Sequence, residues 1–305
     1  MHVVLAGGTG FIGTRLCQSL AHHGHRITLL TRDVGRSGPA LPPGTTTVHW
    51  DARGQGEWTR FIDAADGVVN LAGPSIADGR WTPQRKALLL SARIEATHAL
   101  VEAIRVASQR PRVLVNASAV GYYGDCGDEV ITESHAPGHD FPARLCTAWE
   151  AAAMEAETLG VRVVRARIGI VLAADGGALQ KFLLPFRLFV GGPLGHGKQW
   201  FPWIHRDDTV AILRMALERD DLQGPVNLAA PESVTMRRFA STLGSVLHRP
   251  ALFPVPRLAL RVALGEVADS LLVSQRVEPV VVRRHGYVFQ YPTVMSALQA
   301  ALAAH

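Results

Sequence analysis

The chain has 305 residues, of which 48% are apolar and 19% are charged, so it can bury a sizeable core and is not expected to be disordered. Its formal net charge of +5 is modest, and the lack of a long Lys/Arg run argues against a nucleic-acid-binding arm. The length suits a nucleotide-binding domain with a smaller second lobe.

The cysteines and the start of the chain indicate the compartment. Cys17, Cys126 and Cys146 form no CxxC pair and have no His at metal-ligand spacing, so we expect reduced thiols and no metal site. Met1 leads directly into an apolar run without the charged start of a signal peptide. No stretch of 18 apolar residues is present, so no membrane span is expected. We predict a cytoplasmic protein whose partner is a small molecule, with no nucleic acid and no membrane.

The first half of the chain alternates strand-like and helix-like segments. Short apolar runs predict six strands, at residues 2–6, 26–30, 46–50, 67–71, 112–117 and 161–167. Helical spacing of apolar residues predicts helices at 11–23, 84–108 and 146–159. Strands that alternate with helices are typical of a parallel sheet covered on both faces. We therefore predict an α/β fold of the Rossmann type, with a doubly wound parallel sheet.

The composition changes after about residue 172. Gly and Pro become frequent in 191–202, helical patterns follow at 206–219 and 235–248, and GYVFQY at 286–291 is strand-like. We predict a dinucleotide-binding domain over 1–172 and a smaller substrate-binding lobe over 173–305. The two parts are expected to interleave.

The sequence AGGTGFIG follows the first strand and opens the first helix. Gly7 permits a sharp turn, Gly10 lets the backbone approach a pyrophosphate, and Gly13 allows close packing of helix on strand. The helix start presents unpaired N–H groups to the anion. A glycine triplet between a strand and a helix predicts a dinucleotide site.

The end of the second strand predicts which dinucleotide binds. NAD-selective sites place Asp or Glu there to bind the ribose 2′-hydroxyl, but here Thr31 takes that position and Arg32 follows it. A guanidinium can hold a 2′-phosphate by paired hydrogen bonds, and Arg36 could assist. Asp33 argues weakly for NAD, but it lies beyond the strand end. We therefore predict NADP, with a solvated loop position for Arg32 as the alternative.

Several longer phrases carry a family resemblance. GGTGFIG at 7–13, NLAG at 70–73 and NASAVGYYG at 116–124 resemble the extended short-chain dehydrogenases/reductases, which include nucleotide-sugar epimerases and dehydratases. DEVITE, WEAAA, RIGIVL and, above all, GGPLGHGKQWFPWIHRDD at 191–208 resemble one atypical branch. These are the "epimerase family" proteins, often labelled nucleoside-diphosphate-sugar epimerases.

The resemblance implies a set of cofactor-binding residues and their places. The pyrophosphate would lie on the turn, the adenosine ribose at the second strand, and the nicotinamide half along the ends of later strands. The residues are Gly7, Thr9, Gly10, Phe11, Ile12 and Gly13; Thr31 and Arg32; and Leu71, Ala72, Gly73, Arg93, Ala117 and Val171. Leu71 and Ala72 also fit ordinary core packing.

The acid/base residues of the relatives are missing. Extended relatives use a Tyr-xxx-Lys pair, in which the lysine lowers the tyrosine pKa, but none of the four tyrosines has a lysine four residues later. The remaining candidates are Ser118, at the position where relatives keep a hydrogen-bonding serine, and Tyr122 and Tyr123. Packing of one tyrosine in the core is the alternative.

The second lobe adds aromatic and polar residues in a Gly/Pro-rich loop, a pattern that suits a ligand pocket. We predict substrate contacts from Lys198, Trp203 and His205. His205 could form a hydrogen-bonded pair with Asp208, although a first-turn carboxylate that complements the helix dipole explains Asp208 equally well.

Two functions follow from the sequence. The first is an NADP-dependent oxidoreductase or epimerase that acts on a small, nucleotide-sugar-like molecule with unusual acid/base groups. The second is an NADP-binding sensor or regulator without turnover, which the missing Tyr-xxx-Lys pair favours and which fits the link of some relatives to cell or plastid division. The resemblance also implies a homodimer formed by the helices at 84–108 and 146–159, which would otherwise pack within the core.

Overall fold

A computed structural model describes residues 1–34 and 41–303; Arg36 lies outside these ranges. The strands are β1 (His2–Ala6), β2 (Arg26–Thr31), β3 (Thr46–His49), β4 (Gly67–Asn70), β5 (Val113–Ala119), β6 (Val130–Ile131), β7 (Arg162–Ile168), β8 (Ile170–Ala173), β9 (Trp200–Phe201), β10 (Trp203–His205), β11 (Gly224–Leu228), β12 (Val234–Thr235) and β13 (Arg276–Val277). The α-helices are α1 (Phe11–His22), α2 (Pro83–Val106), α3 (Phe141–Met154), α4 (Gly177–Arg187), α5 (Arg206–Glu218), α6 (Met236–Leu247), α7 (Arg257–Leu264), α8 (Val267–Ser270), α9 (Val280–Arg284) and α10 (Val294–Ala303). Short 3-10 helices cover Glu57–Phe61, Val120–Tyr123 and Glu155–Leu159.

The centre of the molecule is a seven-stranded sheet in the order β11-β7-β5-β4-β1-β2-β3. Every neighbouring pair is parallel. This confirms the predicted doubly wound α/β fold, and all six predicted strands lie in this sheet. The seventh, β11, was not predicted, because its Gly224-Pro225 start is typical of a turn.

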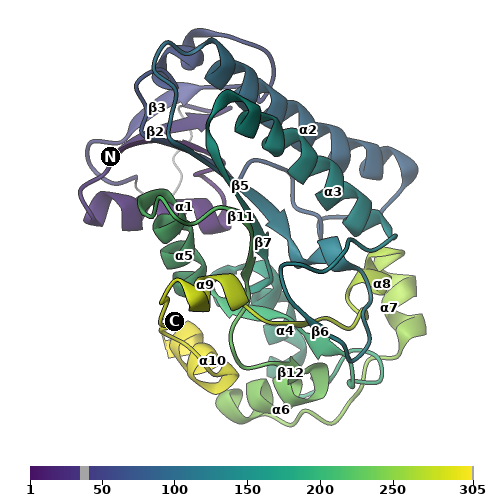
Figure 1. The fold of residues 1–305 in the computed structure, drawn as a ribbon. Helices are drawn as coiled ribbons and strands as arrows, with labels where there is room; N and C mark the ends of the chain where they lie inside the picture. The colour runs from purple at the N-terminus through teal and green to yellow at the C-terminus, as the bar shows by residue number, and fades with distance from the viewer. Residues whose placement is uncertain (35–40, 304–305) are drawn as a thin grey trace.

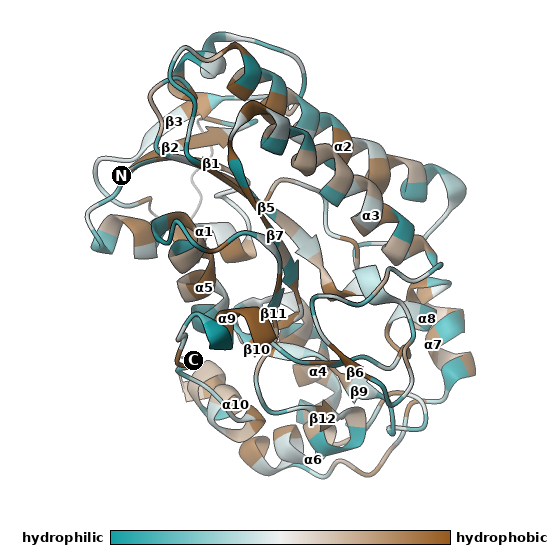
Figure 2. Ribbon diagram, in the orientation of Figure 1, coloured by the Kyte–Doolittle hydropathy of each residue, from teal (hydrophilic) through white to brown (hydrophobic). Residues whose placement is uncertain are grey.

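Helices cover both faces of the sheet (Figure 1). On one face, α1 and α5 bury Leu16, Leu20 and Leu213 against β1, β2 and β7. On the other face, α2 and the end of α3 bury Leu100 and Ala153. These residues pack against the side chains of β1, β2 and β7 that point to this second face. The central strands are mainly apolar (Figure 2), as expected for strands buried on both sides.

The caps of α2 and α3 explain where these helices begin. Thr82 accepts a hydrogen bond from the backbone N–H of Arg85 at 3.1 Å, and Pro83 takes the first helical position. Asp140 caps α3 in the same way, through the N–H of Ala143 at 2.9 Å. Both arrangements satisfy donors that a helix start leaves unpaired.

The second lobe is built from α4, α6, α10 and two small two-stranded sheets, β8 with β10 and β9 with β12. Its core contains Phe186, Trp203, Phe239 and Leu243, all fully buried. However, α5 and β11 lie beyond residue 172 in the chain and belong to the central sheet. The two parts of the chain therefore interleave.

The strand predicted at 286–291 is wrong. This segment is a loop, and the buried carboxylate of Asp208 holds it in place. Asp208 accepts hydrogen bonds from the Tyr287 hydroxyl at 2.7 Å and from the backbone N–H groups of Gln290 and Tyr291 at 2.8 and 3.0 Å. The possible hydrogen bond between His205 and Asp208 is not formed within the described residues, because Asp208 binds the C-terminal loop instead.

Among residues 1–34 and 41–303, no helix is both long and apolar enough to cross a bilayer.

Candidate functional site

The strand order of the sheet reverses at β1. From β1 the chain continues to β2 and β3 on one side, whereas β4 and the later strands lie on the other. In open α/β sheets, ligands bind where the strand order reverses, outside the carboxyl ends of the strands. Here the backbone N–H of Leu71, just after β4, donates to the Ala6 carbonyl at 2.9 Å. A ligand crevice is therefore expected where β1 and β4 end.

The glycine turn fills this place so tightly that side chains do not fit. Gly7 has φ +81°, and a Cβ there would lie 2.6 Å from the Leu71 carbonyl. A Cβ on Gly13 would lie 2.2 Å from the Gly7 oxygen, which is far inside van der Waals contact. Gly10 donates its N–H to that oxygen at 3.1 Å and closes the turn.

The first turn of α1 is open to an anion. Gly10 is the N-cap and supplies no side-chain hydrogen bond, so the helix itself leaves the N–H groups of Phe11, Ile12 and Gly13 unpaired. Thr9 and Gly10 are exposed in front of them. A close-packed glycine cradle at an uncapped helix start fits a pyrophosphate group.

The end of β2 carries no carboxylate at the position that would face an adenosine ribose. Thr31 is half-buried, and its hydroxyl oxygen accepts the backbone N–H of Asp33 at 3.3 Å. Arg32 is exposed and makes no hydrogen bond or ion pair with the part of the chain that the structure describes. Its guanidinium is available to a ligand.

A buried amide network fixes the loop after β4. Asn70 donates to Thr97 Oγ1 at 2.9 Å and to Asn116 Oδ1 at 2.7 Å. Its own Oδ1 accepts the N–H of Ala72 at 3.1 Å. Trp149 of α3 also donates to Thr97, at 3.0 Å. The backbone beside the crevice is thus tied to β5, α2 and α3.

Arg93 continues this support on α2. It is 8% exposed, and it donates to the backbone oxygens of Leu89 at 3.0 Å and of Pro74 at 2.8 Å. Its guanidinium lies 5.1 Å from the centre of the Trp149 ring, and burial lowers its pKa to about 10. Gly73 packs against the same side chain. Arg93 therefore orders the loop at 73–74, and its Nε atom remains buried without a partner.

Comparison with known families decides the identity of this fold. The model of the NAD dependent epimerase/dehydratase family matches residues 3–229, well over half of the chain. The chain belongs to this family. A second model, described as a domain of unknown function (DUF1731), matches residues 255–301.

Individual relatives cover nearly the whole chain. The chloroplastic epimerase family protein SDR39U1 homologue of Arabidopsis thaliana is 41% identical over 99% of this chain and 87% of its own length. The epimerase family protein YfhF of Bacillus subtilis is 36% identical over 99% of this chain and 98% of its own. The crystal structure of human epimerase family protein SDR39U1, isoform 2, with NADPH has a TM-score of 0.89 at 37% identity and covers both chains fully. The predicted atypical branch is therefore confirmed.

More distant members of the family share the fold alone. The structure of UDP-glucuronic acid 4-epimerase from Bacillus cereus in complex with NAD has a TM-score of 0.75 at 17% identity, over 99% of this chain and 96% of that one. This chain thus has the NAD(P)-binding fold of the epimerase/dehydratase family, without the Tyr-xxx-Lys pair of its extended members.

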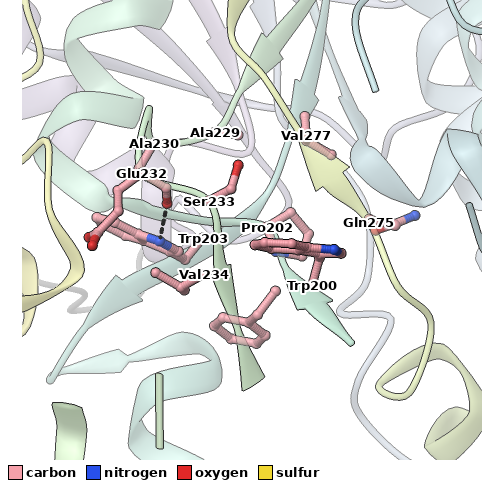
Figure 3. Close-up of a pocket in the computed structure, with 11 residues that line it drawn as sticks. Trp200, Pro202, Trp203, Ala229, Ala230, Glu232, Ser233, Val234, Gln275 and Val277 are labelled. Carbon is pink, nitrogen blue, oxygen red and sulfur yellow. Dashed lines mark hydrogen bonds between the residues drawn. The ribbon is translucent and has the colours of Figure 1, made fainter. Parts of the chain in front are cut away.

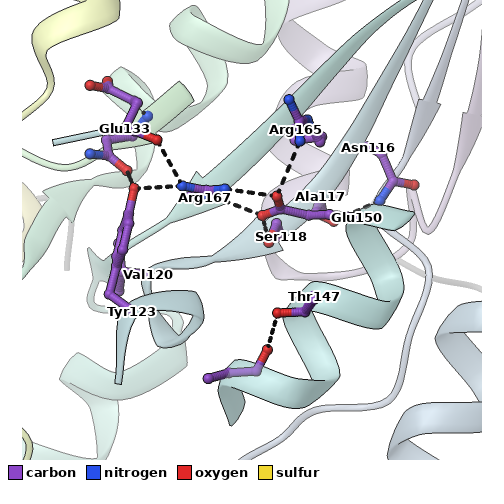
Figure 4. Close-up of polar contacts among 12 residues, drawn as sticks. Asn116, Ala117, Ser118, Val120, Tyr123, Glu133, Thr147, Glu150, Arg165 and Arg167 are labelled. Carbon is purple, nitrogen blue, oxygen red and sulfur yellow. Dashed lines mark hydrogen bonds and ion pairs between the residues drawn. The ribbon is translucent and has the colours of Figure 1, made fainter. Parts of the chain in front are cut away.

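The first predicted acid/base residue, Ser118, lies inside a buried charged network (Figure 4). Its hydroxyl donates to Glu150 Oε1 at 2.7 Å. Glu150 and Arg167 are 3% and 2% exposed and form a two-pronged ion pair, with both N–O distances at 2.9 Å. Burial alone would lower the pKa of Arg167, but the hydrogen bonds and charge of Glu150 outweigh burial and raise it.

Tyr123 belongs to the same network. Its hydroxyl donates to Asn227 Oδ1 at 2.6 Å and accepts from Arg167 at 3.0 Å. Burial raises the pKa of Tyr123 to about 12 despite the nearby guanidinium. The ring of Tyr122 lies over Arg167, 3.5 Å from ring centre to guanidinium carbon. Of the two tyrosines, only Tyr122 has no hydroxyl hydrogen bond within the described ranges.

Sequence reasoning did not assign roles to Glu150, Arg167 or Asn227. A signal was present, because Glu150 interrupts the otherwise apolar phrase WEAAA and Arg167 lies in the mainly apolar strand VVRARI. Their partners come from α3, β5, β7 and β11, and Tyr123 and Asn227 are 104 residues apart. Burial of each charge could be suspected from sequence, but the pairing could not.

The predicted substrate residues of the second lobe lie in different surroundings. Lys198 is exposed on the 191–199 loop. Trp203 is 1% exposed, lines a narrow pocket with Trp200 (Figure 3), and donates its indole N–H to the Glu232 carbonyl at 3.0 Å. Trp203 is thus mainly a core residue.

His205 is the N-cap residue of α5 and is 6% exposed. It pairs with β8 beside Leu172, and its Nδ1 atom accepts the N–H of Asp207 at 3.2 Å at the start of α5. Burial lowers the pKa of His205, although the charges of Asp207 and Asp208 act in the opposite direction. Val171, the predicted neighbour of the nicotinamide, is 8% exposed in the adjacent strand. Within the described ranges, no three His, Cys, Asp or Glu side chains form a metal-binding group.

Proposed function

We propose that this protein binds NADP(H) at the carboxyl edge of its sheet. The observation that carries the proposal is the glycine cradle, in which added Cβ atoms on Gly7 and Gly13 would collide with the backbone in front of an uncapped helix start. The human relative with bound NADPH supports it, because it is 37% identical over the full chain. Leu71, Ala72 and Ala117 would line the nicotinamide half, and Arg93 would hold the loop beside it.

We expect Arg32→Ala to weaken NADPH binding by about 10- to 100-fold, or 1–3 kcal/mol for a charge-assisted contact, and to leave NADH binding nearly unchanged. Arg32 is the exposed cation at the end of β2, where a 2′-phosphate would lie. Fluorescence titrations with both nucleotides measure this. Arg26→Ala is the matched control, because Arg26 is also exposed but at the opposite end of the same strand. Equal NADPH and NADH affinities in the wild type would rule out the NADP assignment.

For the reaction, we propose reduction of a small carbonyl compound to its alcohol, with Tyr122 donating the proton to the carbonyl oxygen; in the reverse oxidation, Tyr122 accepts the proton of the alcohol. When bound, the cofactor supplies or accepts the hydride. Ser118 and Tyr123 already donate their hydroxyl protons to Glu150 and Asn227, which leaves Tyr122 as the remaining predicted candidate. The stacked Arg167 guanidinium holds the Tyr122 ring in place.

Tyr122→Phe is expected to lower turnover by about 100-fold or more, within the usual range for loss of a general acid, without changing NADPH affinity. The assay is the loss of NADPH absorbance over a screen of aldehydes, ketones and nucleotide sugars. Tyr287→Phe serves as control, because its hydroxyl binds Asp208 of the C-terminal loop. An unchanged rate in Tyr122→Phe would exclude Tyr122 as the donor.

A second function, NADP(H) binding without turnover, is favoured by one specific observation. The hydroxyls of Ser118 and Tyr123 form hydrogen bonds within a buried network, and no tyrosine is followed four residues later by a lysine that would lower its pKa. The same screen separates the two functions. Tight NADPH binding with no turnover for any substrate class would support the sensor and contradict the enzyme.

A further inference from the structure

The positive charge of the chain is concentrated in two segments of the second lobe. Residues 176–206 and 233–265 contain no Asp or Glu, but they contain four and five Lys or Arg residues respectively. Of these nine cations, four pair with carboxylates from other segments: Lys181, Arg206, Arg257 and Arg261. The other five have no ion pair within the described ranges: Arg187, Lys198, Arg237, Arg238 and Arg249.

The fold brings the two segments side by side. The N–H of Phe253 donates to Gly191 at 3.3 Å, and the N–H of Val255 donates to Pro193 at 2.9 Å. The stretch that connects α6 to α7 (Figure 1) therefore runs along the turn that follows α4.

Large apolar side chains project from the same region. We name it the basic apolar face and define it by six side chains that are 53–74% exposed: Leu184, Leu188, Phe189, Val190, Leu252 and Phe253. The guanidinium of Arg249 lies 4.4 Å from the centre of the Phe189 ring, so cation and apolar side chains are in direct contact. Contiguous exposed apolar surface of this kind marks an interaction site.

An open groove of about 720 Å³ borders this face along α6. Its lining includes Arg237, His248 and Arg249, the hydroxyls of Ser241 and Ser245, and the apolar Leu252, and contains no carboxylate. The groove thus offers cations and hydrogen-bond donors to an anion directly beside the projecting Leu and Phe side chains.

The positive charge of the basic apolar face indicates which kind of partner can bind it. A second copy that docked through the same face would bring unpaired arginines against arginines, which is unfavourable. An anionic surface with an apolar layer beneath it complements both features, because Leu and Phe enter the layer while Lys and Arg stay at its charged boundary. The side chains also project outward, as insertion requires.

We propose that the basic apolar face docks on the surface of an anionic phospholipid bilayer, with a phosphate headgroup in the groove and Phe189 and Leu252 inserted. Sequence alone predicts no membrane partner, because the two segments are apart in the chain and neither forms a long apolar or basic run. Only the folded lobe joins them.

The test is flotation of the full chain with vesicles of phosphatidylglycerol and phosphatidylcholine, and with vesicles of phosphatidylcholine alone. We expect binding to the anionic vesicles only, and we expect it to fall as salt rises. Phe189→Ser with Leu252→Ser should lower binding at least about tenfold, and Arg187→Glu with Arg237→Glu should do the same.

Matched controls carry the same changes elsewhere. Val106→Ser with Val288→Ser removes two exposed apolar side chains outside the face, and Arg283→Glu with Arg284→Glu reverses two exposed charges on α9. Both controls should float as the wild type does. Unchanged thermal unfolding and NADPH titration show that each variant is folded.

Three results would overturn the proposal. The first is a wild type that does not float with anionic vesicles. The second is a loss of binding in the control pairs as large as in the face variants. The third is a wild-type dimer that the face variants dissociate, which would assign the face to a second copy. Binding of an acidic amphipathic peptide without vesicle binding would assign it to a protein partner.

Discussion

Gly13→Ala should weaken NADPH binding by about 10- to 100-fold and lower the free energy of unfolding by about 1–3 kcal/mol, the usual cost of overpacking a tight site. The added Cβ would lie 2.2 Å from the Gly7 oxygen and 2.6 Å from the Gly8 Cα. Both are backbone atoms, so α1 must move away from the turn. The N–H groups of its first turn would then no longer point toward the pyrophosphate. Titration with NADPH and urea unfolding measure the two effects.

Gly24→Ala is the control for this variant, because Gly24 follows the other end of α1. It has φ +76° but no atom within 4 Å of an added Cβ. It should cost about 1–2 kcal/mol of stability from the left-handed backbone alone and leave NADPH affinity unchanged. Wild-type NADPH affinity in Gly13→Ala would show that the cofactor does not depend on this cradle.

Glu150→Ala should lower the free energy of unfolding by about 3–5 kcal/mol, because it leaves a buried guanidinium without its counter-charge. Arg167 is 2% exposed, and both prongs of its ion pair end on Glu150. Since whole domains are stable by about 5–15 kcal/mol, this is a large fraction. The measurement is urea unfolding followed by circular dichroism.

Two companion variants test the reason for this loss. Glu102→Ala removes an exposed helical pair with Arg105 and should cost only about 0.2–0.5 kcal/mol. Glu150→Met with Arg167→Met removes both buried charges and should be less destabilised than Glu150→Ala alone. If the double variant is the less stable of the two, an uncompensated charge is not the cause.

Local sequence signals were sufficient for the nucleotide-binding half. Most of its strands are short apolar runs, and the glycine spacing at Gly7–Gly13 can be read from consecutive residues. The sequence failed where the partner is distant. GYVFQY has the alternation of a strand. However, the backbone N–H groups of Gln290 and Tyr291 donate to the Asp208 carboxylate and not to a neighbouring strand. The sequence also failed to predict β11. Its first residues, Gly and Pro, are typical of a turn, but they can begin a strand at the edge of a sheet.

The candidate site divides in the same way. The cradle and the exposed Arg32 follow from pattern and spacing. The roles of Ser118 and Tyr123 depend on their hydrogen bonds to Glu150 and Asn227, which lie on other elements. The sequence pattern does not predict these two hydrogen bonds. Trp203 illustrates the same dependence on distant partners, because an aromatic residue in a Gly/Pro-rich segment can be part of a small core.

The position of β11 at the end of the sheet, beside β7, has a consequence for how the chain can be divided. A fragment that ended at residue 172 would leave the backbone of β7 unpaired along one side and uncover the apolar surface that α5 protects. Bare edges of this kind recruit other chains. The nucleotide-binding half is therefore not a portable module, and gene fusions or truncations that treat it as one should yield aggregates.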